Sequence, residues 1–296
     1  MSERIELYKN RSIGERISAA IDFLKQNWKV LYKNILIGGL PLAIIMGYFL
    51  MQQGNIQVIS DLSHIFLYYP FLLFFSFVNF IYLYAMTGAI LLHYGRNQLT
   101  ETTGWNDLKN SFFKLAGKTI SISLMVYTPI LIVVGIMGAI CFLIINVFSA
   151  SGMQVGSFVL IFLLFLLFFG ALVAITPSII MLYFPAYFSG KANVESIKIS
   201  FALGFKNWGS LFVAILITII IFIVVYMVFS MPFQVMVLFS TGHLNILSYI
   251  LATLSSIGTL LIYPIMIIIF AFQYFSIVEK EEGVSLKSQV SEFENL

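Results

Sequence analysis

The residues able to do metal or acid–base chemistry are few and widely spaced. The three histidines are His64, His93 and His243. Asp61, His64 and His243 are the set that would hold a metal if the chain brought them together, yet no HxxxH or HxxE spacing supports it. The sequence also lacks a GxSxG nucleophile elbow, a GxxxxGK[ST] phosphate loop and a DDxxD-type acidic cluster. We therefore expect no metal, no cofactor and no catalytic site.

The long apolar runs of the chain contain no Asp, Glu, Lys or Arg, which argues against a proton- or ion-coupled pump. Their uncharged polar side chains have two interpretations, namely hydrogen bonding between helices or lining of a cavity for an apolar or zwitterionic molecule. These residues are Asn79, Asn146, Thr128, Thr176, Ser178, Thr253, Thr259 and Gln273. The single cysteine, Cys141, has no partner for a disulfide or a zinc site, and we expect it to pack as a small apolar residue.

The composition places the chain in a membrane. Hydrophobic residues make up 60% of the 296 residues and charged residues only 10%, and the mean hydropathy is +0.99. Water-soluble domains carry about 25% charged residues, so this chain cannot cover its surface in water. The net charge of +3 is too small to indicate a nucleic-acid partner.

Six apolar runs are long enough to cross the hydrocarbon core as helices, which takes about 20 residues. They cover residues 34–51, 65–92, 119–148, 157–188, 209–230 and 244–275. Barrel strands would be shorter and would alternate polar with apolar residues, so the runs predict helices. The even-numbered runs exceed one span, and Pro177, Pro185 and Pro264 are available to kink them.

The basic residues fall in alternate loops. Of the 16 Lys and Arg, seven precede the first run, four lie between the second and third, three between the fourth and fifth, and two follow the sixth. The other three loops have none. Because positive residues are retained on the cytoplasmic side, this distribution predicts both termini in the cytoplasm. We expect a multi-pass protein of the cell (inner) membrane of a prokaryote.

Three amphipathic segments precede the odd-numbered spans, over residues 12–28, 103–117 and 193–208. The first begins with a capping-box pattern, Ser12 with Glu15. Each has an apolar stripe at helical spacing. The stripes are Ile13, Ile17, Ile21, Leu24 and Trp28; then Trp105, Leu108, Phe112 and Leu115; and then Val194, Ile197, Phe201, Gly204 and Trp208. We expect these segments to be helices on the cytoplasmic surface of the membrane.

The spacing of these segments indicates an internal repeat. Asn27-Trp28 recurs as Asn207-Trp208, at about two repeat lengths. We predict an all-α, polytopic single domain over residues 1–296 with pseudo-repeats at about 12–92, 103–188 and 193–275. Each repeat is an amphipathic helix followed by a transmembrane hairpin, and residues 276–296 form a charged cytoplasmic tail. The copies run in parallel topology, unlike the inverted repeats of many transporters.

The amphipathic segments carry the candidate functional residues. Trp28, Trp105 and Trp208 are candidate interfacial anchors, because a Trp ring is apolar while its N–H can stay wet. Lysines on the polar flanks are candidate contacts for anionic lipid headgroups, namely Lys25, Lys29, Lys198 and Lys206. The alternative is that these helices only anchor and orient the hairpins.

The stretches AIDFLKQNWKVLYKNILIGGLPL, DLKNSFFKLAGKTISISLMVYTPI and SIKISFALGFKNWGSLFVAILI carry a resemblance of pattern. Over about residues 12–278 the chain resembles a loose group of six-helix prokaryotic membrane proteins that includes the membrane domain of glycerophosphodiester phosphodiesterases. No soluble phosphodiesterase barrel is attached in this sequence, so the resemblance does not imply that activity.

The sequence favours a non-enzymatic membrane protein. We expect an accessory, scaffold or regulatory role in the cell membrane, with the lipid bilayer, anionic headgroups and a membrane protein as partners. The first alternative is a transporter or channel for a lipid-like or small apolar solute. A membrane-embedded enzyme is the third.

Overall fold

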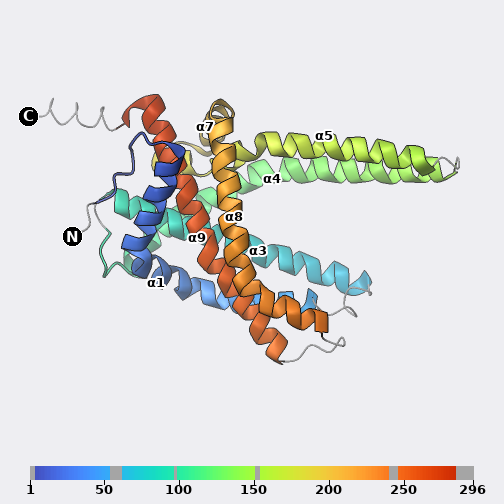
Figure 1. The fold of residues 1–296 in the computed structure, drawn as a ribbon, viewed down its shortest axis with the longest axis horizontal. Helices are drawn as coiled ribbons and strands as arrows, with labels where there is room; N and C mark the ends of the chain where they lie inside the picture. The colour runs from blue at the N-terminus through green and yellow to red at the C-terminus, as the bar shows by residue number, and fades with distance from the viewer. Residues whose placement is uncertain (1–3, 54–61, 97–98, 151–153, 240–245, 285–296) are drawn as a thin grey trace, which may run out of the picture. The chain divides into compact units, whose positions relative to one another are not determined.

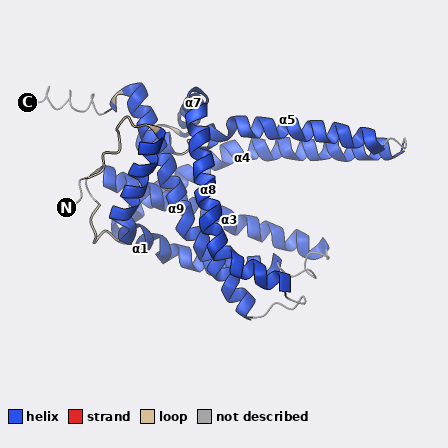
Figure 2. Cartoon of the chain, in the orientation of Figure 1, coloured by secondary structure: helices blue, strands red, loops and turns tan. Residues whose placement is uncertain are grey.

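The computed structural model describes residues 4–53, 62–96, 99–150, 154–239 and 246–284, and every regular element in these ranges is a helix (Figure 2). Six described helices are long and apolar enough to cross a membrane: α1 (Ile13–Gln53), α3 (Leu62–Gly95), α4 (Trp105–Ala150), α5 (Gln154–Ile180), α8 (Trp208–Phe239) and α9 (Ile246–Glu282). Two shorter helices, α6 (Phe184–Phe188) and α7 (Asn193–Lys206), lie between α5 and α8 in the sequence. The predicted all-α polytopic fold is confirmed.

The three amphipathic segments do not form three separate helices. The first two are the opening turns of α1 and α4, because no residue between them and the following spans interrupts the helix. Only the third is a helix of its own, α7, which ends where Asn207 adopts φ −110° and ψ 25°. The predicted capping box at the start of α1 is present, since the Ser12 N–H donates to Glu15 Oε2 at 2.7 Å and the Glu15 N–H to Ser12 Oγ at 3.5 Å.

The chain divides into two compact units. Unit 1 comprises Met1–Gly117 and Gly209–Leu296, and unit 2 comprises Lys118–Trp208. Unit 1 therefore contains α1, α3, α9, the start of α4 and nearly all of α8. Unit 2 contains the rest of α4 with α5, α6 and α7. The boundary between the two units does not coincide with the boundaries of the predicted repeats. The repeats therefore stay a prediction.

In unit 1, α1 packs chiefly against α9, and the two run antiparallel (Figure 1). Large apolar side chains fill the interior, among them Phe23, Leu31, Ile90, Phe272 and Phe275. Their burial removes apolar surface from water or lipid and lets the helices interlock at high density.

One glycine sets how closely α1 and α9 approach. A Cβ placed on Gly47 would lie 2.6 Å from the Cα of Thr253. Because that neighbour is backbone, no rotamer change could make room. Small residues at crossing points allow such close approach of membrane helices.

Helix α1 changes direction within its length (Figure 1). The Tyr82 hydroxyl of α3 donates to the Asn34 carbonyl at 2.9 Å and accepts from the Gly38 N–H at 3.1 Å. In a regular helix these two backbone groups would bond to each other. A side chain inserted into the ladder in this way is a recognised cause of a kink. Gly38 makes room for it, because a Cβ there would lie 2.7 Å from Tyr82 Cε2.

In unit 2, the fourth predicted span is broken near its end. Helix α5 stops at Ile180, a turn follows, and α6 begins at Phe184 with Pro185 in its first turn. Pro185 lacks an N–H and its ring crowds the carbonyl four residues earlier, that of Met181, so α5 cannot continue through it as a regular helix. Of the three prolines named as available for a kink, only Pro185 lies at a break, since Pro177 and Pro264 lie inside α5 and α9.

The long helices of unit 2 are apolar on all sides. No residue in the most apolar 18-residue stretch of α4 or of α5 is buried. Leu131 and Phe158 are 68% and 71% exposed. A helix that is hydrophobic all round is stable only inside a protein or in lipid, so this part of the chain is built for the hydrocarbon core.

Candidate functional site

Residues 4–12, ahead of α1, lie across the ends of α3 and α9 in unit 1; we call them the N-terminal strap. At α3, the Tyr94 hydroxyl accepts from the Ile5 N–H at 2.9 Å and donates to the Ile5 carbonyl at 3.2 Å. The Arg4 guanidinium donates to the Tyr94 carbonyl and stands 4.9 Å from the centre of the Tyr94 ring. These contacts fix the first part of the strap.

The second part of the strap is held by α9. The Tyr8 ring packs edge-on against Phe275, with ring centres 5.0 Å apart. The Arg11 N–H donates to Ser276 Oγ at 3.0 Å, and the Ser276 hydroxyl donates to the Arg11 carbonyl at 3.3 Å. Burial raises the pKa of Tyr8, so its hydroxyl is neutral at physiological pH.

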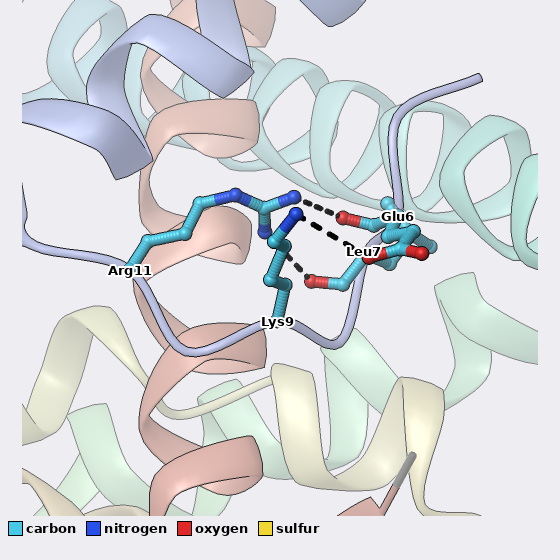
Figure 3. A network of polar contacts seen from close by, with 4 residues as sticks. All are labelled: Glu6, Leu7, Lys9 and Arg11. Carbon is cyan, nitrogen blue, oxygen red and sulfur yellow. Dashed lines mark hydrogen bonds and ion pairs between the residues drawn. The ribbon is translucent and has the colours of Figure 1, made fainter. Parts of the chain in front are cut away.

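Within the strap, Lys9 and Arg11 point toward Glu6 and Leu7 (Figure 3). Arg11 donates to the Glu6 carbonyl at 2.6 Å and to the Leu7 carbonyl at 3.4 Å. The Lys9 ammonium lies 3.8 Å from the Glu6 carboxylate. Burial lowers the pKa of Arg11 and the carboxylates of Glu6 and Glu15 oppose that shift, so Arg11 remains a cation at neutral pH.

Two pockets open along the strap. One, of about 460 Å³, lies between residues 4–8 and Gly95. The other, of about 350 Å³, has three basic and three acidic residues in its lining. They are Arg4, Lys9, Arg11, Glu6, Glu15 and Asp22. This second lining is balanced in charge, which does not favour an anion over a cation.

The strap covers a buried arginine. Arg16, in the first turns of α1, is 7% exposed. Its Nε donates to the Arg11 carbonyl at 2.8 Å, and its Nη1 donates to Ser210 Oγ of α8 at 3.2 Å and to Gln273 Oε1 of α9 at 3.1 Å. One guanidinium thus joins three helices and the strap through neutral acceptors.

The predicted lipid-contact lysines lie on the outside of both units. Lys25 and Lys29 are exposed, one turn apart on α1 in unit 1. Lys25 also lies 3.4 Å from the Asp22 carboxylate. Lys198 and Lys206 are exposed on α7 in unit 2. The structure therefore gives two basic surfaces, one on each unit.

The three tryptophans differ in their surroundings. Trp28 is 54% exposed, beside Lys29. Trp105 packs against Phe112, with ring centres 5.2 Å apart. The Trp208 N–H donates to the Ala174 carbonyl at 3.1 Å, which is a hydrogen bond within unit 2. Only Trp28 has the exposure expected of an interfacial anchor.

The stripes of the amphipathic segments also differ. In α1 the stripe residue Ile21 is 36% exposed and faces outward. In α4 the stripe is turned inward, since Leu108 and Phe112 are buried. This differs from the expectation that all three stripes lie in the headgroup layer. The stripe of α7 is mixed, because Val194 is exposed while Gly204 is buried against Ser178.

The polar residues of the spans divide into two groups. Asn79 Oδ1, Ser178 Oγ, Thr253 Oγ1 and Gln273 Nε2 are buried with no hydrogen-bond partner among the described residues. Asn146 and Thr176 donate to carbonyls one turn earlier in their own helices, at 2.8 and 2.7 Å. In unit 2, Ser123 and Tyr183 pair through their hydroxyls at 2.9 Å, and Thr119 pairs with Tyr187. The hydroxyl pairs join neighbouring segments of unit 2, whereas the bonds of Asn146 and Thr176 stay within one helix, so both interpretations of the polar residues stay open.

The candidate metal ligands are not brought together in the described part of the chain. His93 Nε2 lies 3.3 Å from Ser111 Oγ. Asp61, His243 and the side chain of His64 lie outside the described residues. Among the residues that are described, no group of three or more His, Cys, Asp or Glu could hold a metal ion.

The strap and the burial of Arg16 were not predicted from the sequence, and Gln273 was predicted only as a polar residue of the sixth span. One signal was present, because Arg16, Ala20 and Phe23 share a helix face at i, i+4 and i+7, and Ala20 and Phe23 prove fully buried. An arginine at the head of an apolar face indicates a buried cation. Nothing in the sequence indicated that Gln273 would meet it.

Comparison with known proteins adds no relative. No family model, no curated protein and no solved structure matches the chain. Six long apolar helices make it a multi-pass membrane protein. Any finer statement of function has to come from the arrangement of its own residues.

Proposed function

We propose that the chain is a non-catalytic accessory protein, a scaffold or regulator, of the prokaryotic cell membrane that contacts anionic lipid headgroups. The observation that carries this is the outer face of α1, where Trp28 is 54% exposed between the exposed Lys25 and Lys29. An exposed Trp next to lysines suits the headgroup layer, where the ring finds apolar contact and the ammonium groups find phosphate.

The charge pattern supports the orientation. All 16 Lys and Arg fall before the first span, in alternate loops or after the last span. The positive-inside rule then puts both termini in the cytoplasm, and Lys25, Lys29, Lys198 and Lys206 face the anionic cytoplasmic leaflet.

The use of the polar side chains supports a non-catalytic role over transport. Gln273 is fully buried, and Thr176 bonds to the Leu172 carbonyl. Contact of Asn79, Thr176 or Gln273 with a water-filled cavity would favour transport, and the buried Oδ1 of Asn79 has no hydrogen-bond partner among the described residues. The interior of unit 1 is mainly packed Phe, Leu and Ile, with buried polar residues such as Arg16, Asn34 and Gln273 among them. A packed interior suits a protein that presents surfaces rather than a pathway.

The lysines give a direct test. Replacing Lys25, Lys29, Lys198 and Lys206 with Gln should weaken binding of the purified protein to liposomes rich in anionic lipid, by roughly tenfold for each pair. The double variants K25Q/K29Q and K198Q/K206Q separate the two units. Co-sedimentation at low and high salt measures the effect, which should shrink as salt rises.

The matched control replaces the same four lysines with Arg. It keeps the charge and should bind anionic liposomes as the native protein does. Unchanged lipid preference in the four-fold Gln variant would refute the proposed contact.

A further inference from the structure

The buried Arg16 lacks a counter-charge within the described part of the protein. Its three acceptors are the neutral oxygens of Arg11, Ser210 and Gln273. Burial of its guanidinium is not balanced by any nearby carboxylate in the described residues. A buried cation without an anion is costly, and proteins usually pair it or bind an anion beside it.

Gln273 adds a second donor in the same place. A guanidinium only donates, so the Gln273 carboxamide turns its oxygen toward Arg16. Its Nε2 is then fully buried and has no hydrogen-bond partner among the described residues. Ser210 Oγ accepts from Arg16, which leaves its own proton able to donate. The guanidinium of Arg16 on α1 thus contacts Ser210 of α8 and Gln273 of α9, and the buried Nε2 of Gln273 has no acceptor among the described residues.

We propose that Arg16, Gln273 and Ser210 form a binding site for an oxyanion of the phosphate class, covered by the N-terminal strap. A phosphate offers several strong acceptor oxygens and the negative charge that Arg16 requires, and the planar guanidinium matches two of those oxygens. The source is the phosphate of a lipid headgroup or free phosphate. The site is separate from the lipid contact at the surface lysines and does not depend on it.

The strap explains how the site is controlled. The Arg11 carbonyl takes the Nε proton of Arg16, and the same residue is held by Ser276 of α9. An oxyanion would reach Arg16 by displacing this part of the strap, which would also free the Nε proton of Arg16 from the Arg11 carbonyl.

The test is the thermal stability of the whole protein in a phosphate-free detergent. Adding inorganic phosphate, against chloride at equal ionic strength, should raise Tm by roughly 5 °C at a hundredfold excess over Kd. Adding a short-chain anionic phospholipid in a parallel arm identifies the source. A rise in the phosphate arm points to free phosphate, and a rise only in the phospholipid arm points to a headgroup.

Gln273→Glu is the decisive variant, because it puts a carboxylate where the anion would bind. It should raise Tm in the absence of phosphate and abolish the response to either ligand. Arg16→Gln should also abolish the response, with helical content checked by circular dichroism, and serves if Gln273→Glu does not fold. The four-lysine Gln variant should respond as the native protein does. A native Tm that neither ligand changes would overturn the site.

Discussion

Replacing Gly47 with Leu is expected to destabilise unit 1 by roughly 3 kcal/mol. The Cβ would lie 2.6 Å from the Cα and 2.8 Å from the backbone N of Thr253, so α1 and α9 must move apart. Their separation would break the nearby hydrogen bond from the Tyr249 hydroxyl to the Ile44 carbonyl. Unfolding of the purified protein in mixed micelles, followed by circular dichroism, measures the loss.

The control is Gly135→Leu in α4. A Cβ at Gly135 meets nothing within 4 Å, and the residue is in a helix of the same apolar character. Its stability should stay close to that of the native protein. Equal effects of the two substitutions would show that close packing at Gly47 does not matter.

Replacing Tyr82 with Phe is expected to cost about 1–3 kcal/mol. The ring still fits beside Gly38, but the bridge between the Asn34 carbonyl and the Gly38 N–H is lost. Those groups can then pair only if α1 straightens, which would disturb its packing on α3. The distance between spin labels at positions 21 and 44 of α1 should lengthen if straightening occurs.

Tyr48→Phe is the matched control, because Tyr48 is 50% exposed and has no hydrogen bond to its hydroxyl among the described contacts. It should leave both stability and the label distance unchanged. A Tyr82→Phe protein as stable as the native one, with α1 still bent, would show that Pro41 alone causes the bend.

The main features of the fold could be predicted from local signals. Apolar runs of span length, the alternation of basic loops and the Ser12–Glu15 capping box are all set by neighbouring residues and by the physics of a bilayer. Pro185 is a similar case, since the break before α6 follows from one residue's covalent structure.

The candidate site could not be predicted, because it depends on contacts between distant residues. Arg16 lies 257 positions from Gln273, and Tyr82 lies 44 positions from Gly38. Periodicity showed that α1 has an apolar stripe through Ile21 and Trp28, but the neighbouring face, with Ala20 and Phe23, is the one that is buried. A helix with apolar residues on both faces cannot be oriented by its period alone.

The Trp208 anchor shows the same limit. Its place at the edge of an apolar run is typical of an interfacial ring whose N–H stays wet. In the structure that N–H donates to the Ala174 carbonyl of α5. The sequence carried no sign of this bond, and the role of Trp208 as an interfacial anchor stays a prediction.

Purification from native membranes in a mild detergent, followed by mass spectrometry of retained lipids and proteins, tests the proposed role most directly. Anionic phospholipids should be enriched on the native protein relative to the bulk membrane extract, and the four-lysine Gln variant should lose much of that enrichment. A retained lipid composition equal to that of the bulk membrane, and the same for native protein and variant, would contradict the proposed function.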